Sequence, residues 1–153
     1  MKPNQAYKGL KALPNTDTHN CFACSPGNAS GLQMTFYTDE ERVYSWVTIP
    51  DHMGGWNNIA HGGILSTILD ETMGWAGIYL LEQLTLTKTM TIDFTKAVVV
   101  GDQLRVEGAT AALAFLCSGS HHDTYILTVL TTQSFSIERR SQSCHHSRVN
   151  DHP

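Results

Sequence analysis

The residues best suited to chemistry are a His-Gly-Gly triplet, His61-Gly62-Gly63, and a carboxylate further on, Asp70. Both fall in a segment whose apolar pattern predicts a long helix from about His61 to Glu82. The start of a helix presents unpaired N–H groups and a positive dipole end, and glycine lets a ligand approach that backbone closely. The triplet therefore predicts a place where Gly62 or Gly63 polarises a carbonyl oxygen. His61 by itself is more often a hydrogen-bonded structural residue than a base.

Asp70 shares a helix face with small residues only. Positions three, four and seven apart lie on one face, and this series is Gly63, Ser66, Thr67, Asp70, Gly74 and Gly77. A glycine inside a helix costs about 1 kcal/mol relative to alanine, which suggests that the space is used by a ligand or a second backbone. The structural alternative is that Asp70 pairs with a lysine, an arginine or backbone amides. Glu71 falls on the packing side and is expected to reach a partner at the sheet edge.

The spacing of these groups predicts an assembly. Gly62 and Asp70 are separated by about 12 Å along a helix axis, at 1.5 Å per residue. One carbonyl cannot meet both groups of the same helix. If both act on one carbon, they come from two chains, and a two-fold dimer supplies two such sites.

The surrounding elements follow from periodicity and turn residues. The expected elements are a short helix around Gln5–Leu13, a hairpin of strands Leu32–Tyr37 and Arg42–Ile49, the long helix, and strands near Thr87–Ala97, Gln103–Leu116 and Tyr125–Ile137. This order predicts an α+β domain in which one antiparallel sheet covers one helix. We expect residues 1–30 to be a loop-rich part of the same domain, 31–137 to be its body and 138–153 to be a polar tail.

Composition excludes several classes of protein. The chain has 153 residues, 41% of them hydrophobic and only 16% charged, so it can bury a core and does not resemble a disordered protein. A formal net charge of −4 gives no basic surface for nucleic acid. The N-terminus has no signal-peptide core and no apolar run is long enough to span a bilayer, so the four cysteines are expected to stay reduced in the cytoplasm.

The segment AHGGILSTILDETMGWA resembles the helix of hotdog-fold thioesterases of the phenylacetate-pathway, or PaaI-like, type. The match is His-Gly-Gly, six residues, then an acidic residue, here Asp70. NCFACSPGNASGLQMTFY resembles the segment before the helix in one subgroup, and TIDFTKAVVVGDQLRVEG resembles the strands after it. The resemblance covers about residues 19–108. After Gly108 the family pattern fades.

The resemblance implies a hotdog fold, a homodimer or a homotetramer built as a dimer of dimers, and hydrolysis of acyl-CoA without a cofactor. It implies that a backbone N–H of Gly62 or Gly63 polarises the thioester, while Asp70 acts as nucleophile or as general base. His61 completes the catalytic set, and the expected substrate contacts are Asn58, Thr67, Gly74 and Trp56. The alternatives are a non-catalytic acyl-CoA-binding hotdog protein and, further from the pattern, a hydratase or dehydratase.

Two features of this sequence stand apart from that pattern. Many members have Asn where this chain has Gly55; the nearby Asn57 and Asn58 could substitute for it or cap the helix, and we favour capping. Cys21 and Cys24, with a histidine at position 19, could form half of a zinc site or a redox pair, but no second Cys-x-x-Cys exists. The interpretation favoured by the sequence is a packed loop without a metal. Three basic residues could meet CoA phosphates or be solvated charges: Lys88, Lys96 and Arg105.

Overall fold

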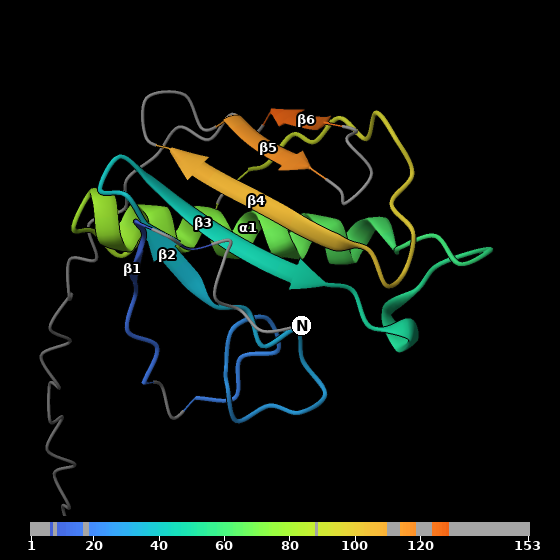
Figure 1. The fold of residues 1–153 in the computed structure, drawn as a ribbon, viewed down its shortest axis with the longest axis horizontal. Coiled ribbons are helices and arrows are strands. Elements are labelled where there is room, and N and C mark those ends of the chain that lie inside the picture. The colour runs from blue at the N-terminus through green and yellow to red at the C-terminus, as the bar shows by residue number, and fades with distance from the viewer. Residues whose placement is uncertain are drawn as a thin grey trace, which may run out of the picture.

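One antiparallel sheet packs against one long helix (Figure 1). The computed structural model describes residues 7, 9–16, 19–87, 89–109, 114–118 and 124–128. The strands are β1 (Lys11–Ala12), β2 (Phe36–Thr38), β3 (Arg42–Thr48), β4 (Gln103–Ala109), β5 (Ala114–Ser118) and β6 (Thr124–Thr128). A 3₁₀ turn, η1 (Asp51–Met53), precedes the helix α1 (Gly62–Leu80). The predicted α+β class is confirmed.

The strands are ordered in the sheet as in the chain, from β1 to β6. The predicted hairpin is confirmed as β2 and β3, with Tyr37 opposite Tyr44. β3 then pairs along its whole length with β4, from Arg42 opposite Ala109 to Thr48 opposite Gln103. The helix lies across these two central strands, and Figure 1 shows the sheet passing in front of it. The core therefore sits between α1 and the β3–β4 pair.

Buried aliphatic side chains from both layers form this core. The helix contributes Leu65, Ile68, Leu69, Met73 and Ala76, and the strands contribute Phe36, Val43, Val47, Leu104 and Val106. The apolar side chains of the helix pattern thus face the sheet. That packing fixes the rotation of the helix, and the position of Asp70 on another side follows from it.

The N-terminal segment differs from its prediction. The helix expected around Gln5–Leu13 is wrong for the described residues, because Lys11 and Ala12 form β1 and pair with β2. The N–H of Leu13 continues this pairing by donating to the Phe36 carbonyl at 2.8 Å. The free edge of the β2–β3 hairpin offers backbone partners, and those long-range bonds override local helix preference.

The segment after the helix also differs. The strand expected at Thr87–Ala97 is wrong, since no residue described in that range lies in a strand, and one isolated bridge joins Ile59 and Val99. Met90 and Ile92 pack on the core while Phe94 is 54% exposed. Alternation in this segment thus reflects the packing of Met90 and Ile92 on the core, and the segment pairs with no neighbouring strand in the described part of the chain.

The last predicted strands are divided differently. The single strand expected at Gln103–Leu116 is two strands, β4 and β5, and the strand expected at Tyr125–Ile137 is β6 (Thr124–Thr128) within the described residues. Its remainder and the predicted tail at 138–153 lie outside the described residues. No helix in the described part combines the length and apolarity needed to cross a membrane.

Candidate active site

The start of α1 is capped by His61. Its backbone is extended (φ −65°, ψ 131°), and its ring Nδ1 accepts a hydrogen bond from the Gly63 N–H at 3.0 Å. The interpretation of Asn57 and Asn58 as caps is wrong, because they lie in the preceding loop with φ of +50° and +63°. Asparagine tolerates this left-handed conformation better than most residues.

The cap leaves one backbone donor available. The Gly63 N–H donates to His61 Nδ1. For the Gly62 N–H, no acceptor is found among the described residues. A cavity of about 310 Å³ lies beside Gly62, with Leu65 and Phe94 in its wall. Of the two glycines named from sequence, Gly62 is therefore the one able to donate to a ligand at the helix start.

Asp70 lines a different and larger cavity, of about 660 Å³. The Thr87 hydroxyl donates to Asp70 Oδ1, and the described contacts give Oδ2 no partner. No lysine, arginine or histidine of the described chain forms an ion pair with this carboxylate. The alternative in which Asp70 pairs with a lysine, an arginine or backbone amides is thus not found among the described residues. Beside Asp70, a Cβ added to Gly74 would meet nothing within 4 Å.

The small-residue face of the helix is only partly open. A Cβ at Gly77 would come within 2.5 Å of Thr85 Oγ1, so the returning segment 85–87 fills the space there. Thr67 donates its hydroxyl to the Gly63 carbonyl at 3.0 Å, four residues back. The face thus serves two purposes: its C-terminal part receives the chain itself, and the part around Gly74 remains hollow.

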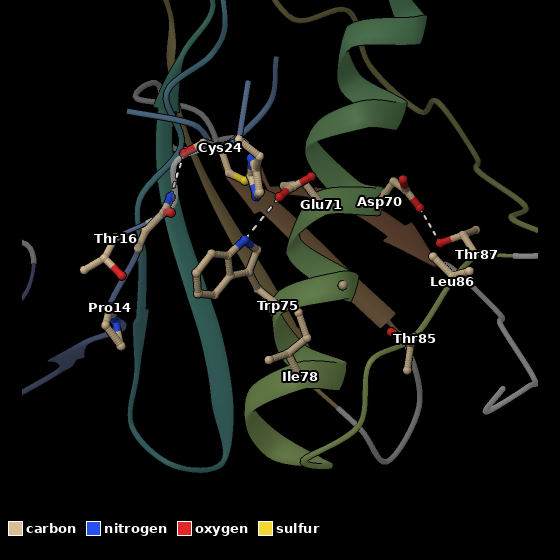
Figure 2. A pocket seen from close by; sticks show the side chains of 13 residues that line it. Pro14, Thr16, Cys24, Asp70, Glu71, Trp75, Ile78, Thr85, Leu86 and Thr87 are labelled. Atoms are coloured by element: carbon tan, nitrogen blue, oxygen red, sulfur yellow. Dashed lines mark hydrogen bonds between the residues drawn. The ribbon is translucent and has the colours of Figure 1, made fainter. Parts of the chain in front are cut away.

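The two carboxylates leave the helix in different directions, as Figure 2 shows. Asp70 points to Thr87, whereas Glu71 accepts a hydrogen bond from Trp75 Nε1 at 3.1 Å and lies 3.9 Å from Cys21 Sγ. Burial, and then the neighbouring Glu71, raise the pKa of the Cys24 thiol well above its usual range. Glu71 is therefore on the packing side, as its helical position indicated, but the expected partner at the sheet edge is wrong, because its partners are Trp75 in α1 and Cys21 in the N-terminal loop.

The structure brings together some predicted site residues and separates others. Asp70 and Gly74 share the larger cavity, while Gly62 lies at the smaller one. Trp56, 85% exposed, and Asn58 line neither of these cavities.

Sequence reasoning missed several residues of the larger cavity. They are Thr85 and Thr87 after the helix and Asn15 and Thr16 before the cysteine loop. No local pattern signals them, because each reaches the site through the path of the chain.

Sequence and structure comparisons agree on the type of fold. Residues 57–114 match the sequence model of the Thioesterase superfamily. Among curated proteins, no sequence is significantly similar to the chain.

Among solved structures, a thioesterase-superfamily protein aligns with a TM-score of 0.60 at 15% identity over 70% of this chain, which spans 57% of that protein's length. The E. coli PaaI protein from the phenylacetic acid degradation operon aligns with a TM-score of 0.55 at 18% identity, covering 61% of this chain and 76% of its own. An acyl-CoA hydrolase from Staphylococcus aureus, solved with butyryl coenzyme A, aligns with a TM-score of 0.54 at 15% identity, covering 60% and 63%. The shared fold and the match around the helix together identify the chain as a hotdog-fold protein that resembles the PaaI-like thioesterases.

Proposed function

We propose that this protein hydrolyses an acyl thioester, with coenzyme A as the thiol, to a free acid. The observation that carries the proposal is the Asp70 carboxylate, which lines a cavity of about 660 Å³ and has a hydroxyl as its partner instead of a cation. A partly buried carboxylate held in this way can attack a carbonyl carbon or accept a proton. The resemblance to solved thioesterases supports the same chemistry.

The reaction has two possible routes at Asp70. As nucleophile, Oδ2 attacks the thioester carbon, the C–S bond breaks, and the CoA thiolate leaves and takes up a proton. Water then hydrolyses the resulting anhydride. As general base, Asp70 takes a proton from a water that attacks the same carbon, and the proton passes to the leaving thiolate. In both routes the developing negative charge on the carbonyl oxygen is stabilised by the Gly62 N–H.

His61 and Thr87 act as positioning residues in this proposal. Because His61 Nδ1 accepts the Gly63 N–H, it fixes the first turn and aims the Gly62 N–H outward. Thr87 holds one carboxylate oxygen of Asp70 and so directs the other into the cavity. Gly74, which lines the cavity of Asp70, and Thr67, on the same helix face, are the proposed substrate contacts, although Thr67 does not line that cavity.

We further propose that each site combines two chains in a homodimer, which can pair again as a tetramer. Within one chain, Gly62 and Asp70 open onto different cavities and lie about 12 Å apart along the helix. A second copy related by a two-fold axis would bring its helix start to Asp70. Asn58 and Trp56, in the exposed loop before the helix, are then expected to meet substrate bound at the partner's cavity. We expect this activity in the cytoplasm.

A thiol-release assay over a panel of acyl-CoA substrates tests the activity. We expect turnover by the wild type and a loss of about 10²-fold or more in kcat/KM for Asp70→Ala, within the range of catalytic acid–base contributions. Asp93→Asn is the matched control, since Asp93 is an exposed carboxylate outside both cavities. Saturable CoA binding without turnover on any substrate would contradict the hydrolase and leave a binding protein.

Mixing two inactive variants tests the composite site. Gly62→Pro removes only the Gly62 N–H, because proline is well tolerated at the first helical position. After mixing with Asp70→Asn, a mixed dimer has one intact site, so random assembly restores about a quarter of wild-type activity. Mixed dimers that form but stay inactive would rule out a site shared between chains.

A further inference from the structure

A second group of reactive side chains borders the same large cavity as Asp70 but lies where Glu71 leaves α1 in another direction, and it has no role in the proposed hydrolysis. Cys21, Cys24 and Glu71 place two sulfur atoms and a carboxylate oxygen within 4.8 Å of one another. The two cysteines stand three positions apart in a turn, and the glutamate reaches them from the helix. The sequence offered the cysteine pair with the histidine at position 19, and the fold brings Glu71 from the helix to the two cysteines.

Backbone hydrogen bonds fix the turn that carries the cysteines. The Ser25 N–H donates to the Cys21 carbonyl at 3.2 Å and closes the turn. Inside it, the Ala23 N–H donates to Cys21 Sγ at 3.4 Å. The turn therefore holds this sulfur in one position, next to Cys24 and Glu71.

Glu71 lacks a positive partner in the described part of the chain. It is half-buried, and its partners are the Trp75 indole N–H at 3.1 Å and Cys21 Sγ at 3.9 Å. No ion pair forms between Glu71 and a described basic side chain. A carboxylate withdrawn from water is costly unless a charge compensates it, and a cation among the two sulfurs would do so.

We propose that Cys21 Sγ, Cys24 Sγ and a Glu71 oxygen bind one thiophilic divalent cation, for which Zn²⁺ is the probe. Zinc takes such ligands at about 2.3 Å for sulfur and 2.0–2.2 Å for oxygen in a tetrahedral arrangement. Roughly 3.5–3.8 Å between ligand atoms follows from that geometry, so the three atoms need only a small inward movement. Cys24 and Glu71 also line the larger cavity, from which a water would complete the set.

Binding releases the two thiol protons to solvent and joins the N-terminal loop to the helix. The cysteine loop is already joined to the segment that follows it, because the Leu32 N–H donates to the Phe22 carbonyl at 2.8 Å. The cation would add a connection from the loop to α1. Its role is structural, and it stands independently of the hydrolysis at Asp70.

Cobalt titration of the full-length, reduced protein tests the proposal. We expect one Co²⁺ per chain, with tetrahedral visible bands and a thiolate-to-cobalt charge-transfer band, and displacement by Zn²⁺. Cys21→Ser and Cys24→Ser should each weaken the charge-transfer band. Each should also reduce the affinity for Co²⁺ by more than about 100-fold, the upper end of what loss of a residue that only supports a ligand costs. Glu71→Gln should reduce affinity while the charge-transfer band remains, because both sulfurs are still present.

Two controls separate this site from the rest of the chain. Cys144→Ser removes a cysteine far along the sequence from the Cys21–Cys24 pair, and Glu82→Gln removes an exposed carboxylate just beyond the helix; neither belongs to the proposed ligand set, so both should bind as the wild type does. Zn²⁺ should raise the melting temperature of the wild type and of both controls, but not of Cys24→Ser. Absence of a charge-transfer band in the wild type, or an undiminished band in both Cys21→Ser and Cys24→Ser, would overturn the proposal.

Discussion

Glu107 on the sheet is buried and Asp70 on the helix is partly buried, and the partners of the two carboxylates differ. Glu107 is buried in β4 and forms ion pairs with Arg42 at 3.1 Å and Arg105 at 2.6 Å. Among the described residues, Asp70 has a threonine hydroxyl as its partner and a cavity beside it. The fold therefore compensates one carboxylate with two cations and leaves the other with none in the described residues.

This difference separates structural from chemical use of the same functional group. A carboxylate enclosed by guanidinium groups has both of its oxygens occupied by charged donors. A carboxylate with one neutral donor keeps an oxygen free for substrate or water. The contrast predicts that removing charge at the two positions has opposite consequences for activity and for stability.

Asp70→Asn gives the largest expected effect. It keeps the shape and the Thr87 contact but removes the nucleophile or base, so kcat/KM should fall by about 10²–10⁴-fold. The free energy of unfolding should change by less than about 0.5 kcal/mol, because no ion pair is broken. Steady-state kinetics and denaturant unfolding of the same sample measure both. A large loss of stability would mean that Asp70 is structural, like Glu107.

Gly77→Ala and Gly74→Ala sharpen the contrast within the helix face that carries Asp70. The new methyl at Gly77 collides with Thr85, so it should destabilise the protein by about 1–3 kcal/mol and displace Thr87 from Asp70. The same change at Gly74 meets open space and should stabilise the helix by up to about 1 kcal/mol. Chemical unfolding distinguishes them. Equal effects at both positions would contradict the described path of residues 85–87.

Glu107→Gln should be a stability variant with little effect on the chemistry. It removes the charge that faces Arg42 and Arg105. Because these two arginines are about half-exposed, solvent screens the ion pairs, and the free energy of unfolding should fall by only about 1–2 kcal/mol. Thermal unfolding at low and high salt measures it, and the loss should shrink as salt rises. A fall in kcat/KM comparable to that of Asp70→Asn would break the comparison.

The smallest expected effect is on the pH dependence of stability and comes from Tyr44, which lies on β3 opposite Glu107. Burial, and then the hydrogen bond its hydroxyl donates to Asp39 at 2.6 Å, raise the pKa of Tyr44 to about 12. Because the unfolded phenol loses its proton first, near pH 10, the free energy of unfolding should fall as pH rises from 10 to 12. Tyr44→Phe should show a shallower fall over that window. Parallel curves for the two proteins would exclude a role for this phenol.

The sequence predicted the helix, the hairpin and the class of fold because their periodic patterns coincide with their packing. His61 illustrates the limit of this reasoning: it was named for its type, but its role as cap depends on a backbone angle that no motif encodes. The missing strand at Thr87–Ala97 shows another limit, since alternation specifies which side chains face the core and does not supply a hydrogen-bonding neighbour.

The candidate site was partly predictable for the same reason. Asp70 and Gly74 were found from their shared helix face, which is a local property. Thr87 and the N-terminal residues Asn15 and Thr16 reach the cavity from far along the chain. Their positions depend on the path that the loops take. Small side chains on the helix leave room for that path but do not determine it.

The pairing of β3 with β4 has a consequence for how the molecule folds. These neighbouring strands are joined through the whole of residues 49–102, which include the helix, whereas β2 and β3 are joined by a short turn. Closing a long loop carries an entropic cost that local hairpins avoid, and such non-local pairing slows folding. The hairpin can therefore form early, while docking of the helix and closure of the central strand pair set the rate at which the native state is reached.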